Sequence, residues 1–182
     1  MWFIERRSMR IFRDACQGGG KGGEPGELSG GGDRRLAANS DQRNRAMVEI
    51  KIDYQGDLHC EAVHGPSGDR LQTDAPVDNN GRGEAFSPTD LVATALGACM
   101  STVMGIVARR KEIDLAGLKV TVRKFMSEDS PRRISRLELD LEMPLPGNHP
   151  DRRLLESAAN GCPVHHSLHP DIEVVMNWTW RD

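Results

Sequence analysis

The pattern of apolar and polar residues along the chain becomes regular at about residue 47. Apolar residues then recur at every second position from Val48 to Tyr54, which is the period of a strand with one buried face. Turn residues at 55–57 lead to a second strand over about 58–63, and those at 64–68 lead to a third over 69–73. We therefore expect a half-buried strand followed by two antiparallel neighbours.

A long helix is predicted after the polar loop at 74–86. Ser87 is a favourable N-cap, Pro88 suits the first helical position, and Asp90 completes a capping-box pattern. Basic residues at 109–111 lie at the end of the helix, where they interact favourably with its dipole. The body of the helix carries a broad apolar stripe at helical spacing, formed by Leu91, Val92, Ala95, Leu96, Cys99, Val103, Ile106 and Val107.

The strand period returns after this helix. Two strands and a helix are predicted in succession, then a short helix opened by Pro163 with Cys162 at its N-cap, and a last strand that places Trp178 and Trp180 on one face. This order of elements is typical of an α+β domain with an antiparallel sheet. The predicted elements centre on Leu118–Val122, Leu137–Met143, Asp151–Asn160 and Ile172–Trp180.

Composition divides the chain at the same place as the pattern. The first 46 residues hold nine of the 19 glycines, with nine basic and six acidic residues and no periodic apolar pattern. We therefore expect a disordered Gly/Arg-rich extension over residues 1–46. Residues 47–182, with 15 basic and 21 acidic residues, form a single compact domain. Their acidic balance argues against a nucleic-acid partner.

The chain contains no uninterrupted run of about 18 apolar residues, and its start has no apolar stretch of secretory length. We therefore expect a cytoplasmic protein with no membrane partner. The four cysteines are widely spaced, and in a reducing compartment such residues are structural, metal-binding or catalytic. They are Cys16, in the extension, and Cys60, Cys99 and Cys162.

Cys99 and Cys162 differ in their expected environments. A thiolate is the nucleophilic form, and an ordinary thiol, with a pKa of about 8.5, is only slightly ionised at pH 7. Cys162 is expected to aim its sulfur at free backbone N–H groups, with His165 and His166 three and four residues further on. Both effects favour the thiolate, so local physics indicates Cys162 as the attacking thiol. Cys99, in mid-helix on the apolar stripe, is an inert core residue unless a cation lies nearby.

Several side chains admit two interpretations. Cys162, His165 and His166, extended by His169, offer soft and imidazole ligands for a metal ion, or else form a hydrogen-bonded histidine cluster. Cys60 is a core or edge residue or a third redox thiol.

The charged candidate residues also have two interpretations each. Asp90 is the cap of its own helix or an acid–base group. Arg70 and Arg82 solubilise loops or orient a peroxide.

The run Ser87-Pro88-Thr89-Asp90-Leu91 leading to Gly97-Ala98-Cys99, followed by Cys162-Pro163-Val164, resembles the OsmC/Ohr family over roughly residues 47–180. The resemblance implies an intertwined homodimer in which each protomer contributes strands and the long helices pack centrally. Members characterised as enzymes are thiol peroxidases that reduce organic hydroperoxides without a cofactor. On this resemblance Cys99 is the peroxide-attacking thiol and Cys162 the resolving one, and a dithiol, of lipoyl type in the better-known branch, reduces their disulfide.

The motif departs from the peroxidase branches at one position. Those branches place a Glu directly after the Pro, where this chain has Thr89, and the nearest carboxylate is Asp90. They also hold the thiolate with an Arg, for which Arg70 and Arg82 are the nearest in sequence. The chain is therefore similar to OsmC-like members that lack the Glu. The predicted function is a cysteine-based peroxidase. The alternatives are a non-catalytic stress or ligand-binding protein on the same fold, and a metal-binding protein.

Overall fold

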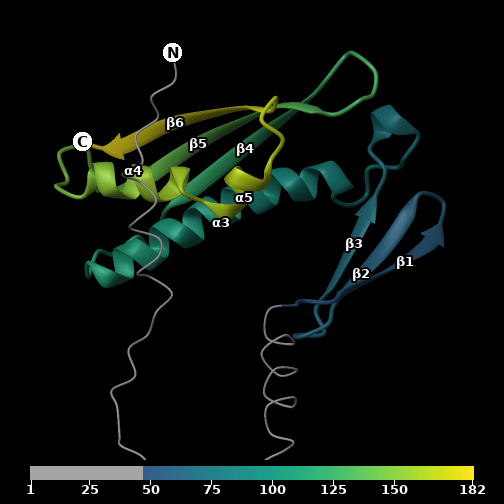
Figure 1. Cartoon of the computed structure of the whole chain (residues 1–182), viewed down its shortest axis with the longest axis horizontal. Coiled ribbons are helices and arrows are strands. Elements are labelled where there is room, and N and C mark those ends of the chain that lie inside the picture. Colours follow the sequence, from purple (N-terminus) through teal and green to yellow (C-terminus); the bar gives the residue numbers. More distant parts are fainter. Residues whose placement is uncertain (1–46) are drawn as a thin grey trace, which may run out of the picture. The chain divides into compact units, whose positions relative to one another are not determined.

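The computed structural model describes residues 47–182, which form an α+β domain with two three-stranded sheets (Figure 1). The predicted fold class and order of elements are confirmed, including the third strand and the short second helix of the C-terminal part. The predicted extension over residues 1–46, with Cys16, lies outside the described residues. The elements are β1 (Ile50–Gly56), β2 (His59–His64), β3 (Arg70–Asp74), the 3₁₀ turn η1 (Val77–Asn79), α3 (Pro88–Arg110), β4 (Lys119–Met126), β5 (Ile134–Pro146), α4 (Arg152–Asn160), α5 (Pro163–Ser167) and β6 (Glu173–Arg181).

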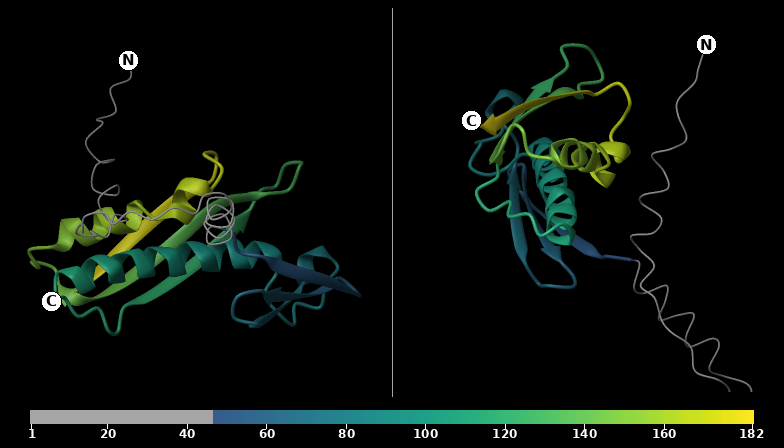
Figure 2. Two further views of the ribbon diagram at one scale, coloured as in Figure 1. Left: turned by 60° about the horizontal axis from the view of Figure 1, so that its bottom comes forward. Right: turned by 90° about the vertical axis from the view of Figure 1, so that its left-hand side faces the viewer.

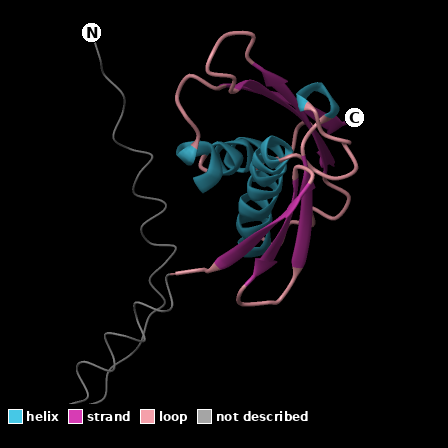
Figure 3. Ribbon diagram, turned by 90° about the vertical axis from the view of Figure 1, so that its right-hand side faces the viewer, coloured by secondary structure: helices cyan, strands magenta, loops and turns pink. Residues whose placement is uncertain are grey.

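The first sheet, β1–β2–β3, is antiparallel throughout, and its strands lie side by side in Figure 3. Its register places four apolar side chains of β1 and β3 on one face, which we call the apolar face of the first sheet. Its members are Ile50, Ile52, Tyr54 and Leu71, which are 58%, 66%, 65% and 39% exposed. The expectation of a half-buried strand is therefore wrong for the single protomer, because the alternation is present but no other described segment covers this face.

The second sheet, β4–β5–β6, is mixed rather than purely antiparallel. β4 and β5 pair antiparallel, whereas β5 and β6 pair parallel, with Leu139 opposite Met176. The reason is the connection: the chain leaves β5, crosses through α4 and α5, and returns in the same direction, as a helical crossover requires. Figure 2 shows α3 and α4 running along this sheet.

The core lies between the second sheet and its helices. Leu137, Leu139 and Leu141 alternate along β5 and are fully buried against α3 and α4. Val120 and Val122 of β4 share this inner face, and Gly97 allows a close approach of α3, since a Cβ there would lie 2.9 Å from Val122. The remaining fully buried members of the core are Leu96, Met100, Met104, Leu155, Ala159 and Cys162.

Helix α3 begins where its sequence predicts. The Ser87 backbone N–H donates to Asp90 Oδ2 at 2.8 Å, and the Asp90 backbone N–H donates to Ser87 Oγ at 3.2 Å, so the capping box is complete.

By length and composition alone, α3 could cross a membrane, although it contains no uninterrupted apolar run of that length. Small polar residues such as Thr94 and Ser101 interrupt any apolar run without making the helix polar. The core helices of globular proteins pass the same test, and α3 packs on the second sheet.

Candidate active site

The fold brings Cys99 and Cys162 together from segments 63 positions apart in the sequence. Cys99 lies in the middle of α3, and Cys162 is the N-cap of α5, which follows α4 and packs on α3. The two thiols lie near enough for Cys99 to raise the pKa of Cys162, and Cys99 packs against the core cluster to which Cys162 belongs. Both are free thiols, and their exposure differs: Cys99 is half-buried, whereas Cys162 is fully buried.

Burial determines the ionisation of Cys162. The loss of solvent around its sulfur raises the pKa of this thiol, and the hydrogen bond with Cys99 raises it further. The backbone N–H groups of His165 and Val164 act in the opposite direction but do not outweigh burial. The expectation that local physics favours a Cys162 thiolate is therefore wrong, because the N-cap position is also a core position.

The histidines after Cys162 form a small stacked group rather than a ligand set. The rings of His165 and His166 are stacked with centroids 6.0 Å apart, and His165 Nδ1 lies 3.3 Å from the Asn160 carbonyl oxygen. His169 Nδ1 instead accepts a hydrogen bond from the Asp171 backbone N–H at 3.2 Å. Within residues 47–182, no three His, Cys, Asp or Glu side chains gather as metal ligands, so the alternative of a metal site at Cys162, His165 and His166 finds no support.

Arg70 and Arg82, the arginines nearest in sequence to the Ser87–Leu91 motif, form ion pairs elsewhere in the protomer. Arg70 forms an ion pair with Glu61 on the polar face of the first sheet, and Arg82 lies 3.5 Å from Asp57 of the β1–β2 turn. Neither has an interaction with Cys99. Cys60 lies on β2, the central strand of the first sheet, with half-buried side chain, opposite Tyr54 in register.

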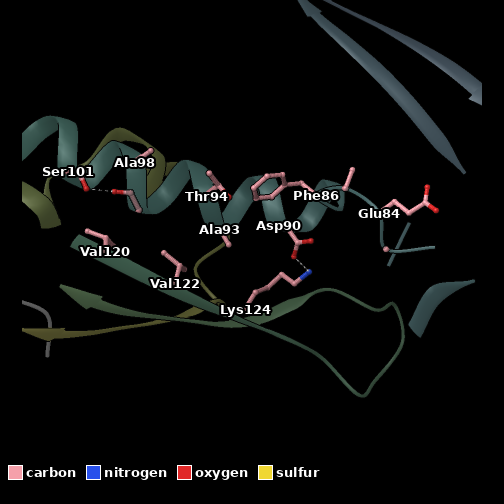
Figure 4. Close-up of a pocket in the computed structure, with 13 residues that line it drawn as sticks. Glu84, Phe86, Asp90, Ala93, Thr94, Ala98, Ser101, Val120, Val122 and Lys124 are labelled. Carbon is pink, nitrogen blue, oxygen red and sulfur yellow. Dashed lines mark hydrogen bonds and ion pairs between the residues drawn. The ribbon is translucent and has the colours of Figure 1, made fainter. Parts of the chain in front are cut away.

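A polar cluster occupies the first turn of α3, at the position where the peroxidase motif has its Glu. Lys124 Nζ donates to Asp90 Oδ1 at 2.7 Å (Figure 4). It also donates to Thr89 Oγ1 at 2.7 Å and lies 3.4 Å from Ser87 Oγ. Partial burial, the largest effect, raises the pKa of Asp90, but the hydrogen bonds from Lys124 and Ser87 and the charge of Lys124 lower it overall. Asp90 is thus a helix cap, as one of its two interpretations proposed, and also the partner of a lysine.

Lys124 is a member of the site that was not predicted from the sequence. The strand period is the signal that indicates its position. Lys124 follows Val120 and Val122 at every second residue of one strand, so its side chain lies on the inner face of the sheet. Its side chain is only 15% exposed. A charged residue on an inward position needs a partner, and the capping box supplies it.

A cavity of about 860 Å³ opens between α3 and β4 and has this cluster at one end. Its α3 side is formed by small residues, and Phe86 lies at the preceding loop (Figure 4). Neither Cys99 nor Cys162 lines it. Because helix positions advance by about 100°, the wall residues Asp90, Gly97 and Ser101 face away from Cys99. The cavity and the thiol pair are separate features of the protomer.

The fold and the two neighbouring thiols define a class of α+β proteins with paired cysteines. Comparisons with known proteins identify the family. A family model described as "OsmC-like protein" matches residues 81–177. The chain is 45% identical to a candidate osmotic stress induced and detoxification response protein from Psychrobacter arcticus 273-4, with a TM-score of 0.69 over 72% of this chain and 96% of that one. The chain therefore belongs to the OsmC family.

More distant structures share the fold. An organic hydroperoxide resistance protein OsmC from Legionella pneumophila is 18% identical, with a TM-score of 0.60 over 73% of this chain and 96% of that one. A candidate organic hydroperoxide resistance protein from Vibrio cholerae, with captopril in one of its active sites, is 20% identical, with a TM-score of 0.60 over 72% of this chain and 90% of that one. No curated protein sequence matches the chain.

Proposed function

We propose that this protein is a cysteine-based peroxidase that reduces organic hydroperoxides in the cytoplasm through Cys99 and Cys162. The observation that carries the proposal is the proximity of the two free thiols, one half-buried and one fully buried, which lets Cys99 raise the pKa of Cys162. The family also supports a role in stress and peroxide defence, since several OsmC-fold relatives are named organic hydroperoxide resistance proteins.

The difference in exposure assigns the roles. A hydroperoxide must reach the attacking sulfur. Cys99 is the more exposed of the pair, whereas Cys162 is fully buried in the core. The Cys99 thiolate attacks the terminal peroxide oxygen, an alcohol leaves, and Cys99 becomes a sulfenic acid. The Cys162 thiol condenses with it, a disulfide forms and water leaves. A dithiol of the lipoyl type then restores both thiols by exchange.

The surroundings of Cys99 favour an organic substrate over hydrogen peroxide. Val103 lies one turn and Val92 two turns from Cys99 on the same face of α3, and both are half-buried. Val164 and Leu168 extend the apolar surface from α5. An alkyl group gains free energy there that hydrogen peroxide cannot, at about 25 cal/mol for each Å² of apolar surface removed from water.

We also propose that the functional unit is a homodimer. The apolar face of the first sheet exposes four large side chains, and within residues 47–182 nothing covers them. Only a third of the most apolar part of α3 is buried in the protomer. Exposed apolar patches mark interaction sites, and a two-fold dimer is the commonest assembly that covers the same patch on both protomers.

The test is turnover of cumene hydroperoxide with a dithiol reductant. Wild type is expected to consume the peroxide, Cys99→Ser to lose turnover, and the matched control Cys60→Ser to keep it. If wild type and Cys99→Ser are equally inactive with every dithiol tried, the peroxidase proposal is wrong.

One observation favours a second function, a non-catalytic ligand-binding protein. The cavity between α3 and β4 has room for a small molecule and does not include the thiols, and Lys124 bonds to Thr89 where the peroxidase motif has a Glu. Absence of sulfenic acid and disulfide after peroxide treatment, combined with binding of an apolar probe that protects against unfolding, is the result that selects this function.

A further inference from the structure

We propose that His165 accepts the proton of Cys162 while the disulfide with Cys99 closes, so that it serves the resolving step and not the attack on peroxide. This inference rests on the proposed peroxidase function and adds to it a residue that acts on one step only. Three observations lead to it: the state of the Cys162 thiol, the position of His165, and the tautomer of its ring.

The resolving step needs a base. Cys162 is fully buried, and burial raises the pKa of its thiol, so the group that condenses with the sulfenic acid is protonated at neutral pH. Its proton has to leave as the S–S bond forms. The neighbouring thiol cannot take it, because in the sulfenic acid state Cys99 carries a hydroxyl group that is itself the leaving group.

His165 stands next to this thiol. Cys162 is the N-cap of α5 and His165 is the third residue of that helix, and residues three apart on a helix have Cβ atoms about 5–6 Å apart. Its side chain is half-buried, and it turns back to Asn160, the last residue of α4. His165 therefore spans the junction of α4 and α5 at which Cys162 lies.

The contact with Asn160 assigns the tautomer of His165. A carbonyl oxygen only accepts hydrogen bonds, so Nδ1, 3.3 Å from it, carries the proton and donates. In the neutral ring Nε2 then has a free lone pair and is the basic nitrogen. The backbone thus holds the imidazole in the form that accepts a proton. His166 is the next residue, with its ring stacked on His165 and its side chain exposed.

Disulfide closure is a single displacement at the Cys99 sulfur. The S–H bond of Cys162 breaks and its proton passes to His165 Nε2, while the Cys162 sulfur displaces the hydroxyl group of the Cys99 sulfenic acid. The S–O bond breaks, the S–S bond forms, and the proton on His165 joins the leaving hydroxide as water. The hydroperoxide consumed in the first step is the oxidant, so no further co-reactant is required.

The experiment separates attack from closure in the full-length protein. One equivalent of cumene hydroperoxide is mixed with the reduced protein, sulfenic acid is trapped with dimedone, and disulfide is followed by mass spectrometry. His165→Ala is expected to form sulfenic acid at the wild-type rate and to close the disulfide about 10- to 100-fold more slowly, the lower part of the range for a positioned base. Added imidazole is expected to restore part of that rate. The matched control, His166→Ala, is expected to close like wild type.

A second variant distinguishes a proton acceptor from a structural contact. His165→Gln keeps an N–H donor for the Asn160 carbonyl but has no basic nitrogen, so it is expected to close as slowly as His165→Ala. Closure at the wild-type rate in His165→Gln, or equal slowing in His166→Ala, overturns the inference while leaving the peroxidase intact. If wild type itself forms neither sulfenic acid nor disulfide, the proposed function fails and this inference fails with it.

Discussion

Replacing Lys124 with Met tests whether the polar cluster at the first turn of α3 stabilises the start of that helix. The Lys124 side chain is only 15% exposed, and its ammonium group donates to Thr89 and Asp90 at 2.7 Å. A hydrogen bond to a charged group contributes about 1.5–3 kcal/mol, but Asp90 is 40% exposed and solvent replaces part of that. We therefore expect a loss of about 2 kcal/mol in the free energy of unfolding.

The assay is urea unfolding followed by circular dichroism, with thermal unfolding as a second readout. A loss of about 2 kcal/mol lowers the Tm of a chain of this size by about 4–8 °C. The matched control is Arg123→Met, since Arg123 is the preceding residue of β4, faces the other side of the sheet, and pairs with Asp140 at 2.5 Å in a half-exposed position. That variant is expected to lose less free energy of unfolding than Lys124→Met, because solvent screens the exposed pair. Equal losses in the two variants would refute the reasoning from burial.

Three further predictions follow from exposure and charge. In the native reduced protein a maleimide is expected to modify Cys99 at least about tenfold faster than the buried Cys162, and equal rates by peptide mapping contradict the assigned roles. Because Asp90 has a lowered pKa in the folded protein, its stabilisation is present above the pKa of the unfolded chain and is lost as the pH falls through the folded pKa, below 3.8. Asp90→Asn is therefore expected to be less stable than wild type at neutral pH and equally stable in strong acid, and a difference that persists in acid, by urea unfolding, opposes this linkage. Ile52→Asp, on the apolar face of the first sheet, is expected to give monomers in light scattering while Lys51→Asp on the opposite face remains dimeric; a dimeric Ile52→Asp argues against that interface.

Local features of the fold could be predicted from the sequence because their causes are local. The capping box at Ser87 and Asp90 needs only residues three apart, and the structure has both of its hydrogen bonds. The strand periods likewise locate β1, β4, β5 and β6. The direction of β6 could not be read from alternation, because a strand looks the same in either direction and only its crossover through two helices makes it parallel to β5.

Features that depend on distant segments were predicted less well. The N-cap position of Cys162 suggested a thiolate, but the packing of α5 on α3 buries the sulfur and reverses the shift in its pKa. The alternation in β1 indicated a buried face, which the protomer leaves open. The partner of Asp90 is Lys124, on a strand more than thirty residues later. In each case the residue can be identified in the sequence, but only the fold or a partner molecule brings to it the neighbour that determines its ionisation or burial.

The contact between Cys99 and Cys162 is the basis of the proposed chemistry, and intact-mass analysis tests it most directly. After one equivalent of cumene hydroperoxide, the reduced wild-type protein is expected to lose the mass of two hydrogen atoms per chain, and digestion is expected to yield one crosslinked peptide that contains both cysteines. Cys162→Ser is expected to stop at a sulfenic acid on Cys99. A wild-type protein that stays fully reduced, or that links either cysteine to Cys60 instead, contradicts a redox cycle built on this pair.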